Sequence, residues 1–279
     1  MIVMPVHNAL DEAFAIARRE GRAALLPYLT GGMPDPDRFV DVAVAILEAG
    51  GDALEIGIPF SDPLLDGPVI QSTQQRALDA GITPARCLDF AAAINARAAQ
   101  PLIFMTAYNP VLAYGLERFC RDARAAGIVG LIVTDVPLEE QAELRGAAGA
   151  NQIHLIAFAT PTSTPERLQA LAGAASGFVY GASVAGVTGA RDSVVATAEP
   201  MVRAVREVTD VPIAVGFGIA GPRQAAEVAA FADGVAVGTA LVRLLDETPP
   251  EDRIEAAQRF IRELRDAARR EVGDVSYVQ

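Results

Sequence analysis

Residues 53–71 read ALEIGIPFSDPLLDGPVIQ, and the interpretation of the fold depends on this stretch. Its first part has the features of a short buried strand, with Glu55 between Leu54 and Ile56. Because side chains alternate along a strand, Glu55 points away from its two apolar neighbours. Residues 57–68 contain three prolines and two glycines, which predicts a shaped loop, and a helix is expected within Pro68–Ala80. The stretch therefore predicts one strand–loop–helix unit.

The same unit recurs along the chain. Short apolar runs, each followed by a helical pattern, occupy residues 23–30, 53–56, 101–105, 129–133, 153–157, 177–180, 212–216 and 234–237. Near-continuous apolar strands are typical of parallel strands covered on both faces. For 279 residues, of which 51% are hydrophobic, these eight units predict one domain over residues 1–279, a closed (β/α)8 TIM barrel. An extra N-terminal helix, Asn8–Arg19, is expected to cover one end of the core.

The alternative fold is an open, doubly wound sheet. Such a sheet has a glycine-rich phosphate turn after its first strand, and Gly31-Gly32-Met33-Pro34 matches that turn poorly. We therefore favour the barrel.

Composition excludes several functions. The net charge is −12 without blocks of like charge, so no nucleic-acid-binding surface is expected. All 23 basic residues are arginine, which excludes lysine Schiff-base chemistry, lysine-anchored pyridoxal phosphate and a Walker A lysine. With only two cysteines and two histidines, no Cys/His metal site is expected. No signal peptide or membrane span is evident, so the expected location is the cytoplasm.

Two acids are the candidates for catalysis. Glu55 ends the second strand, and Asp66 lies in the following loop. In a barrel the active site lies at the carboxyl ends of the strands, where Asp135 and Tyr180 are also expected. A strand-end carboxylate with a loop carboxylate is typical of general acid/base catalysis. The alternative is that Glu55 pairs with an arginine and that Asp66 only shapes a turn; we favour catalysis.

Glycines in the last three loops are the candidates for phosphate binding. These segments are Gly186-Val187-Thr188-Gly189, Gly216-Phe217-Gly218 and Gly238-Thr239. Glycine lets backbone N–H groups approach an anion closely, and a helix N-terminus favours negative charge. The last loops of a barrel commonly bind phosphate. The alternative is that these glycines only relieve crowding in the barrel.

Together these motifs resemble the alpha-subunit family of tryptophan synthase. The segment Leu54–Pro68 closely resembles that family's strand-two signature. Five further motifs follow in the family's order: Tyr108-Asn109-Pro110, Asp135-Val136-Pro137, Gly186-Val187-Thr188-Gly189, Gly216-Phe217-Gly218-Ile219 and Val237-Gly238-Thr239-Ala240. The chain departs from the family at Thr239, where serine is usual, at Ala107, where an aromatic residue is common, and at Val184, where a polar residue is frequent.

The resemblance implies cleavage of indole-3-glycerol phosphate to indole and glyceraldehyde 3-phosphate in tryptophan biosynthesis. Glu55 and Asp66 then match the two catalytic acids: Glu55 moves both protons, and Asp66 accepts the indole N–H. Thr188 matches a mobile-loop residue that contacts the Asp66 position. The other substrate-binding positions implied are Phe60 and Tyr180 for the indole and Gly189, Gly218, Gly238 and Thr239 for the phosphate. Gly216 is a further substrate-binding position.

The resemblance also implies a partner, a beta subunit that carries pyridoxal phosphate in an alpha2beta2 tetramer, and no cofactor in this chain. Two alternatives stay open. One is a stand-alone lyase that releases free indole. The other is a non-catalytic regulatory barrel, against which the intact Glu55, Asp66 and Thr188 speak.

Overall fold

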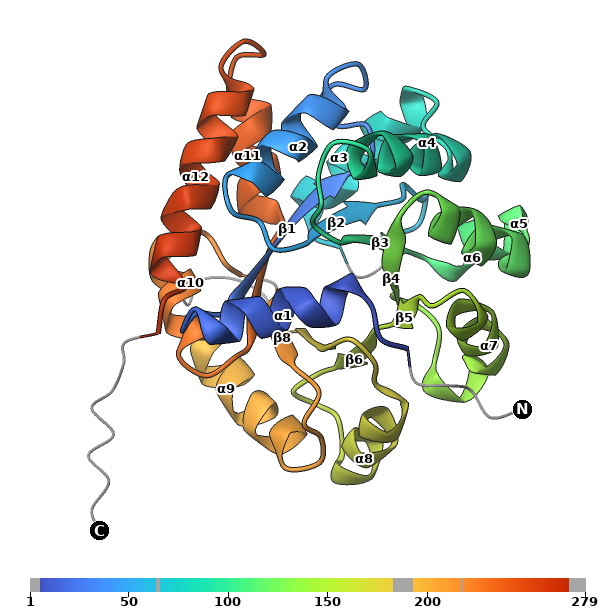
Figure 1. Ribbon diagram of the computed structural model, residues 1–279, viewed down its shortest axis with the longest axis vertical. Helices are drawn as coiled ribbons and strands as arrows, with labels where there is room; N and C mark the ends of the chain where they lie inside the picture. The colour runs from blue at the N-terminus through green and yellow to red at the C-terminus, as the bar shows by residue number, and fades with distance from the viewer. Residues whose placement is uncertain (1–5, 64–65, 183–192, 217, 271–279) are drawn as a thin grey trace.

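The computed structural model of the protein describes residues 6–63, 66–182, 193–216 and 218–270. An inner ring of strands lies within an outer ring of helices (Figure 1). All strand pairs between neighbours in the ring are parallel, as the near-continuous apolar runs predict. The described strands are β1 (Ala24–Thr30), β2 (Leu54–Gly57), β3 (Leu102–Thr106), β4 (Ile128–Val133), β5 (His154–Leu155), β6 (Ala157–Ala159), β7 (Val179–Ala182), β8 (Ile213–Gly216) and β9 (Gly234–Val237).

The barrel closes through β5 and β6. The order of the strands in the sheet is β5-β4-β3-β2-β1-β9-β8-β7-β6, so β5 and β6 lie at its two ends. Only Ile156 separates the two strands, and its N–H donates to the carbonyl of Leu131 in β4 at 3.0 Å. The first half of this strand thus pairs with β4 and the second half with β7. The two halves form the fifth of eight strand positions, so the predicted (β/α)8 barrel is confirmed, with one strand split.

Twelve α-helices and one 3-10 helix surround the strands in the described part of the chain. They are α1 (Ala9–Arg19), α2 (Phe39–Glu48), α3 (Pro68–Asp79), α4 (Pro84–Asn95), α5 (Tyr108–Tyr114), α6 (Leu116–Ala125), η1 (Leu138–Glu140), α7 (Ala142–Ala150), α8 (Pro165–Ala174), α9 (Ser193–Arg206), α10 (Pro222–Ala229), α11 (Thr239–Glu247) and α12 (Arg253–Ala267). Helix α5 was not expected from the sequence. It is separated from α6 by Gly115, whose positive φ of 94° ends one helix and starts the next.

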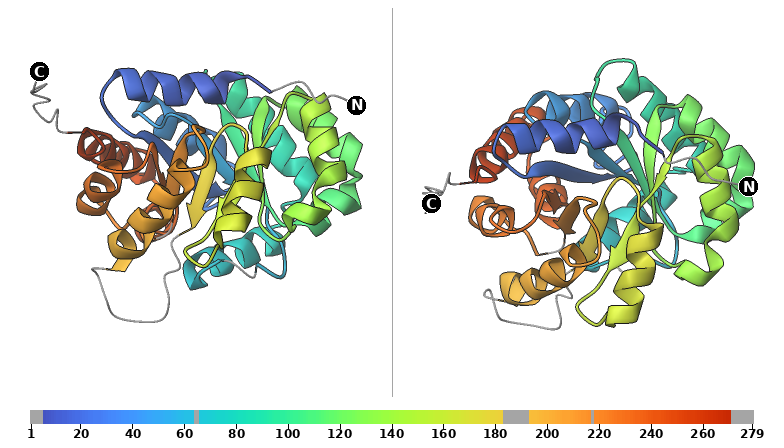
Figure 2. Two further views of the ribbon diagram at one scale, coloured as in Figure 1. Left: turned by 90° about the horizontal axis from the view of Figure 1, so that it is seen from below. Right: turned by 60° about the horizontal axis from the view of Figure 1, so that its bottom comes forward.

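Helix α1 closes the amino-terminal end of the barrel. Asn8 caps it: its side-chain oxygen accepts from the N–H of Leu10 at 2.9 Å, and the N–H of Asn8 donates to the Asp11 carboxylate at 2.7 Å. Leu10, Phe14 and Ala17 are buried in the cluster that fills the barrel interior. Figures 1 and 2 show α1 lying across the ends of the strands, which confirms the extra N-terminal helix.

Two apolar layers hold the barrel together. One lies between the strands and the surrounding helices, where Phe39, Phe104 and Phe119 are fully buried. The other fills the barrel interior beneath α1, around Leu26 and Phe178. Burial of such apolar side chains is the main driving force of folding. None of the described helices is long and apolar enough to cross a membrane. The packed interior leaves space at the carboxyl ends of the strands, where the cavity lies.

Candidate active site

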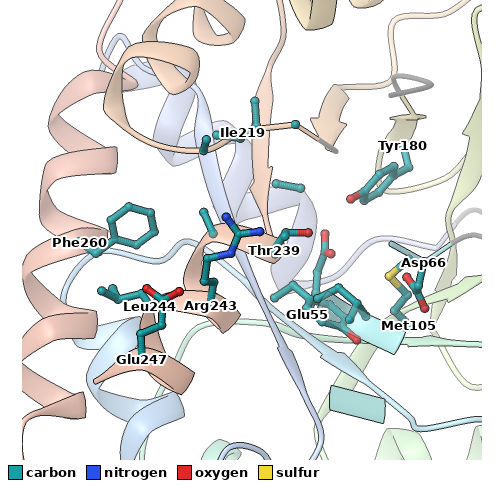
Figure 3. Close-up of a pocket in the computed structure, with 17 residues that line it drawn as sticks. Glu55, Asp66, Met105, Tyr180, Ile219, Thr239, Arg243, Leu244, Glu247 and Phe260 are labelled. Carbon is teal, nitrogen blue, oxygen red and sulfur yellow. The ribbon is translucent and has the colours of Figure 1, made fainter. Parts of the chain in front are cut away.

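A cavity of about 510 Å³ opens at the carboxyl ends of the strands. Glu55, Asp66, Gly218, Gly238 and Thr239 all line it. In Figure 3, Thr239 lies on the side of the two acids that faces Arg243. Barrel enzymes carry their active sites at this face.

Glu55 is the most deeply buried acid of the cavity. It lies in β2, in register with Tyr28 of β1 and Ile103 of β3, and only 1% of it is exposed. Its Oε1 atom has no hydrogen-bond partner within the described residues. Burial disfavours the charged form and raises the pKa of Glu55 from 4.5 to about 8. Near neutral pH this carboxyl group therefore holds a proton, which it can donate.

Asp66 is held by two glutamines of helix α3. Gln74 donates from Nε2 to Asp66 Oδ2 at 2.5 Å, and its Oε1 accepts from the N–H of Phe60 at 3.0 Å. Gln71 donates from Nε2 to the carbonyl of Asp66 at 2.8 Å. Burial raises the pKa of Asp66 from 3.8 to about 6, although the bond from Gln74 lowers it. The two acids thus titrate at different pH, the pattern by which one site obtains an acid and a base.

Two tyrosines in equivalent strand positions line the cavity. Tyr28 of β1 lies in register with Glu55, and Tyr180 of β7 lies in register with Ala214 of β8. Gly57 follows Glu55 by two residues in β2, and Gly216 follows Ala214 by two residues in β8. A side chain at either glycine would collide with the hydroxyl of the adjacent tyrosine. These glycines therefore let the tyrosine rings lie across the next strand.

The far end of the cavity is formed by backbone. Gly218 has a positive φ of 81°, a conformation that favours glycine. Gly238 directly precedes α11, and no side chain caps this helix N-terminus. The first N–H groups of a helix lack partners within the helix, and the helix dipole places partial positive charge there.

The structure brings most of the predicted site residues together. Those that line the cavity are Glu55, Asp66, Tyr180, Gly218, Gly238 and Thr239. Phe60 instead lines a smaller neighbouring cavity of about 40 Å³, which shares Asp66 with the main one. Gly216 is not among the described lining residues and lies beneath the Tyr180 ring. Thr188 and Gly189 lie outside the described residues.

Sequence reasoning missed three residues of the site. Tyr28 lies in the first expected strand, but only the register shows that it neighbours Glu55. Gln74 shares a helix face with Gln71, three residues apart, so the helical period could have placed both against the preceding loop. Arg243 is four residues beyond Thr239 on α11 and lines the cavity.

The described lining of the cavity includes no cysteine or histidine. Within the described part of the chain, no group of three His, Cys, Asp or Glu side chains is placed to hold a metal ion. Cys87 and Cys120 are buried free thiols. Burial raises their pKa values to about 12 and about 11, so both are protonated near neutral pH. Glu55 and Asp66, which line the cavity, have pKa values of about 8 and about 6 and so lie much nearer neutral pH than either thiol.

The fold is that of a (β/α)8-barrel enzyme, and its cavity holds two carboxyl groups with raised pKa values, which suit acid–base chemistry. Residues 14–269 match the profile of the family described as "Tryptophan synthase alpha chain". The chain is 47% identical over 264 residues to the tryptophan synthase alpha chain of Chloroflexus aggregans, covering 94% of this chain and 99% of the relative. It is also 43% identical over 254 residues to that of Geobacter sulfurreducens, covering 91% and 96%.

Solved structures agree with these relatives. A structure of Mycobacterium tuberculosis tryptophan synthase superposes with a TM-score of 0.87 at 39% identity, covering 94% of this chain and 98% of that chain. The Legionella pneumophila alpha subunit gives 0.86 at 31% identity, covering 94% and 98%. The chain belongs to the tryptophan synthase alpha chain family. It is a lyase of tryptophan biosynthesis that cleaves indole-3-glycerol phosphate to indole and glyceraldehyde 3-phosphate.

Proposed function

We propose that Glu55 and Asp66 carry out this cleavage, with Glu55 as the acid and base and Asp66 as the anchor of the indole ring. The observation that supports these roles is that both carboxyl groups line one cavity with pKa values of about 8 and about 6. Near neutral pH Glu55 starts protonated, whereas Asp66 is mostly ionised. The site thus has a proton donor and a fixed negative charge before substrate enters.

The reaction needs two proton movements of opposite direction. Glu55 donates its proton to C3 of the indole, which weakens the bond from C3 to the glycerol chain. That bond breaks, and its electron pair restores the aromatic ring of indole. The hydroxyl on the first glycerol carbon loses its proton to Glu55 as the carbonyl of glyceraldehyde 3-phosphate forms. Glu55 therefore ends the cycle protonated, as it began.

Asp66 stabilises the charge that protonation creates. When C3 takes up a proton, positive charge develops on the ring nitrogen. The carboxylate of Asp66 accepts the indole N–H and lowers the energy of this intermediate. The bond from Gln74 occupies Oδ2 and leaves Oδ1 for the indole.

The remaining residues bind the two ends of the substrate. Tyr180 and Phe60 line the indole end, and Gly216 acts through the position of the Tyr180 ring. Gly218, Gly238 and Thr239 bind the phosphate with backbone N–H groups and one hydroxyl. For Thr188 and Gly189, the proposal rests on the family motif in the sequence: Thr188 contacts Asp66 and Gly189 the phosphate when the site closes.

A beta subunit is the partner of this family. We infer an alpha2beta2 tetramer in the cytoplasm, with pyridoxal phosphate in the beta subunit and no cofactor in this chain. The absence of lysine supports this division, because pyridoxal phosphate is held as a lysine Schiff base.

The test is an assay of the purified chain, alone and with increasing amounts of a tryptophan synthase beta subunit. We expect indole and glyceraldehyde 3-phosphate in equal amounts, a complex with the mass of two chains of each kind, and faster cleavage in the complex. Cleavage without complex formation would identify a stand-alone lyase. No cleavage under either condition would overturn the assignment.

A further inference from the structure

The charges around the cavity do not suit the substrate that it receives. Its described lining includes three carboxyl groups, Asp66, Glu247 and Glu55, of which Glu55 is protonated near neutral pH, and a single basic side chain, Arg243. A phosphate monoester carries about 1.5 to 2 negative charges near neutral pH. Binding such an anion in an acid-lined cavity of a chain with net charge −12 requires a local positive charge.

Arg243 is placed to supply that charge. It follows Thr239 by four residues on α11, so both side chains extend from the same face of the helix. Figure 3 shows the guanidinium group of Arg243 directed toward Thr239 and Ile219, with the carboxylate of Glu247 on the other side of the Arg243 stem. The cation thus lies at the glycine end of the cavity.

The guanidinium group is available for a ligand. Among the described residues, Arg243 forms no ion pair, although acidic residues outnumber basic ones by 35 to 23. On the same helix, Asp246 forms an ion pair with Arg76 at 2.6 Å. Helix α11 therefore does form ion pairs with its neighbours, but Arg243 does not take part in one among the described residues. A planar guanidinium group with five donors fits phosphate oxygens in a two-bond arrangement.

We propose that Arg243 is a positioning residue for the substrate phosphate and makes the site specific for phosphorylated substrates. This inference rests on the proposed phosphate end at Gly218, Gly238 and Thr239. Backbone N–H groups hold the anion within the cavity, and Arg243, which is exposed at the rim, neutralises the oxygens that face solvent. In Figure 3, Thr239 lies between the Arg243 side chain and Glu55, so Arg243 acts on binding and leaves the proton transfers to Glu55.

The experiment compares Arg243→Gln and Arg243→Lys with Arg259→Gln. Arg259 is an exposed arginine of α12 outside the cavity lining, so its variant removes the same charge from a neighbouring helix. We expect Arg243→Gln to raise KM for indole-3-glycerol phosphate about five- to tenfold with little change in kcat, as for one partly exposed charged hydrogen bond. Arg243→Lys should restore part of the loss, and Arg259→Gln should match the wild type.

Two inhibitors separate this inference from the proposed phosphate site itself. Glycerol 3-phosphate should inhibit Arg243→Gln about five- to tenfold less strongly than wild type, whereas indole-3-glycerol should inhibit both equally. The salt dependence of KM should be weaker in Arg243→Gln than in wild type. Equal losses in Arg243→Gln and Arg259→Gln, or equal losses for both inhibitors, would overturn the role of Arg243. A wild type that does not distinguish glycerol 3-phosphate from glycerol would instead overturn the phosphate site.

Discussion

At the end of the cavity formed by β2 and its loop, the groups proposed to act on the substrate are two side chains, one set in a strand and the other held by a second side chain. Glu55 lies within a strand, and Asp66 is bonded to Gln74 at 2.5 Å. At the end formed by the loops after β8 and β9, the groups are backbone at Gly218 and Gly238, and Arg243 is an exposed side chain without an ion pair among the described residues.

The difference fits the roles that we propose for the two ends. Proton transfer needs carboxyl groups with shifted pKa values, which burial provides, and a fixed geometry, which hydrogen bonds provide. Anion binding needs several donors that are open to the ligand, which glycine backbone provides without desolvating a charge in the empty site. Substitutions at the first end should therefore change kcat, and substitutions at the second should change KM.

The largest effect is expected for Glu55→Gln. The variant keeps the shape of the side chain but cannot donate and recover a proton, so kcat should fall by about 10²- to 10⁴-fold. Steady-state kinetics measures the loss, and Asp66→Asn, which removes the negative charge that faces the indole, should lower kcat by a similar or smaller factor. Near-normal turnover in either variant would remove that residue from the mechanism.

Unfolding measurements separate catalysis from folding in Glu55→Gln. The pKa of Glu55 is raised from 4.5 to about 8 in the folded protein, so the folded state binds the proton more tightly than the unfolded state. The free energy of unfolding of the wild type should therefore fall as pH rises through this range, and Glu55→Gln should lose this dependence. At about pH 9 the buried Glu55 of the wild type is ionised, which costs free energy, so Glu55→Gln should be at least as stable as the wild type. A lower free energy of unfolding in the variant at this pH would contradict the burial of an unpaired carboxyl group.

An intermediate effect is expected for Gln74→Leu. Its bond lowers the pKa of Asp66, so its loss should move the acid limb of the kcat/KM profile upward from about 6 and reduce the maximum about tenfold. Gln71→Leu is the matched control, because Gln71 contacts the Asp66 carbonyl and not its carboxylate. An unchanged acid limb in Gln74→Leu, or the same shift in both variants, would show that Gln74 does not act through the carboxylate.

The smallest effect is expected for Gly238→Ala. Gly238 has a negative φ of −109°, and an added methyl group would meet Tyr28 at 3.4 Å, an ordinary contact, so the fold should tolerate it. The methyl group hinders the approach of phosphate to the helix N-terminus, and KM should rise about three- to tenfold with kcat nearly unchanged. Gly146→Ala in α7, where an added methyl has open space, serves as the control. A fall in kcat without a change in KM would place the phosphate elsewhere.

The sequence was sufficient to predict the barrel and to place Glu55 and Asp66 at one face of it, because both depend on local patterns. Apolar runs mark the strands, and a strand-end Glu55 followed by a proline-rich loop with Asp66 places both acids at one face. Tyr28 and Arg243 were not predicted, because their place in the cavity depends on strand register and on the direction of α11. The split of the fifth strand at Ile156 was missed for a related reason: the apolar pattern continues across a change of pairing partner.

Helix α1 closes the barrel at the amino-terminal ends of its strands. Leu10, Phe14 and Ala17 fill the amino-terminal mouth, and Asp11 is bonded to the buried His154 at 2.8 Å across that mouth. In the described part of the chain the cavity opens at the opposite, carboxyl end of the strands, and we expect indole to leave by that end. A beta subunit docked beside this end of the barrel would then lie next to the released indole.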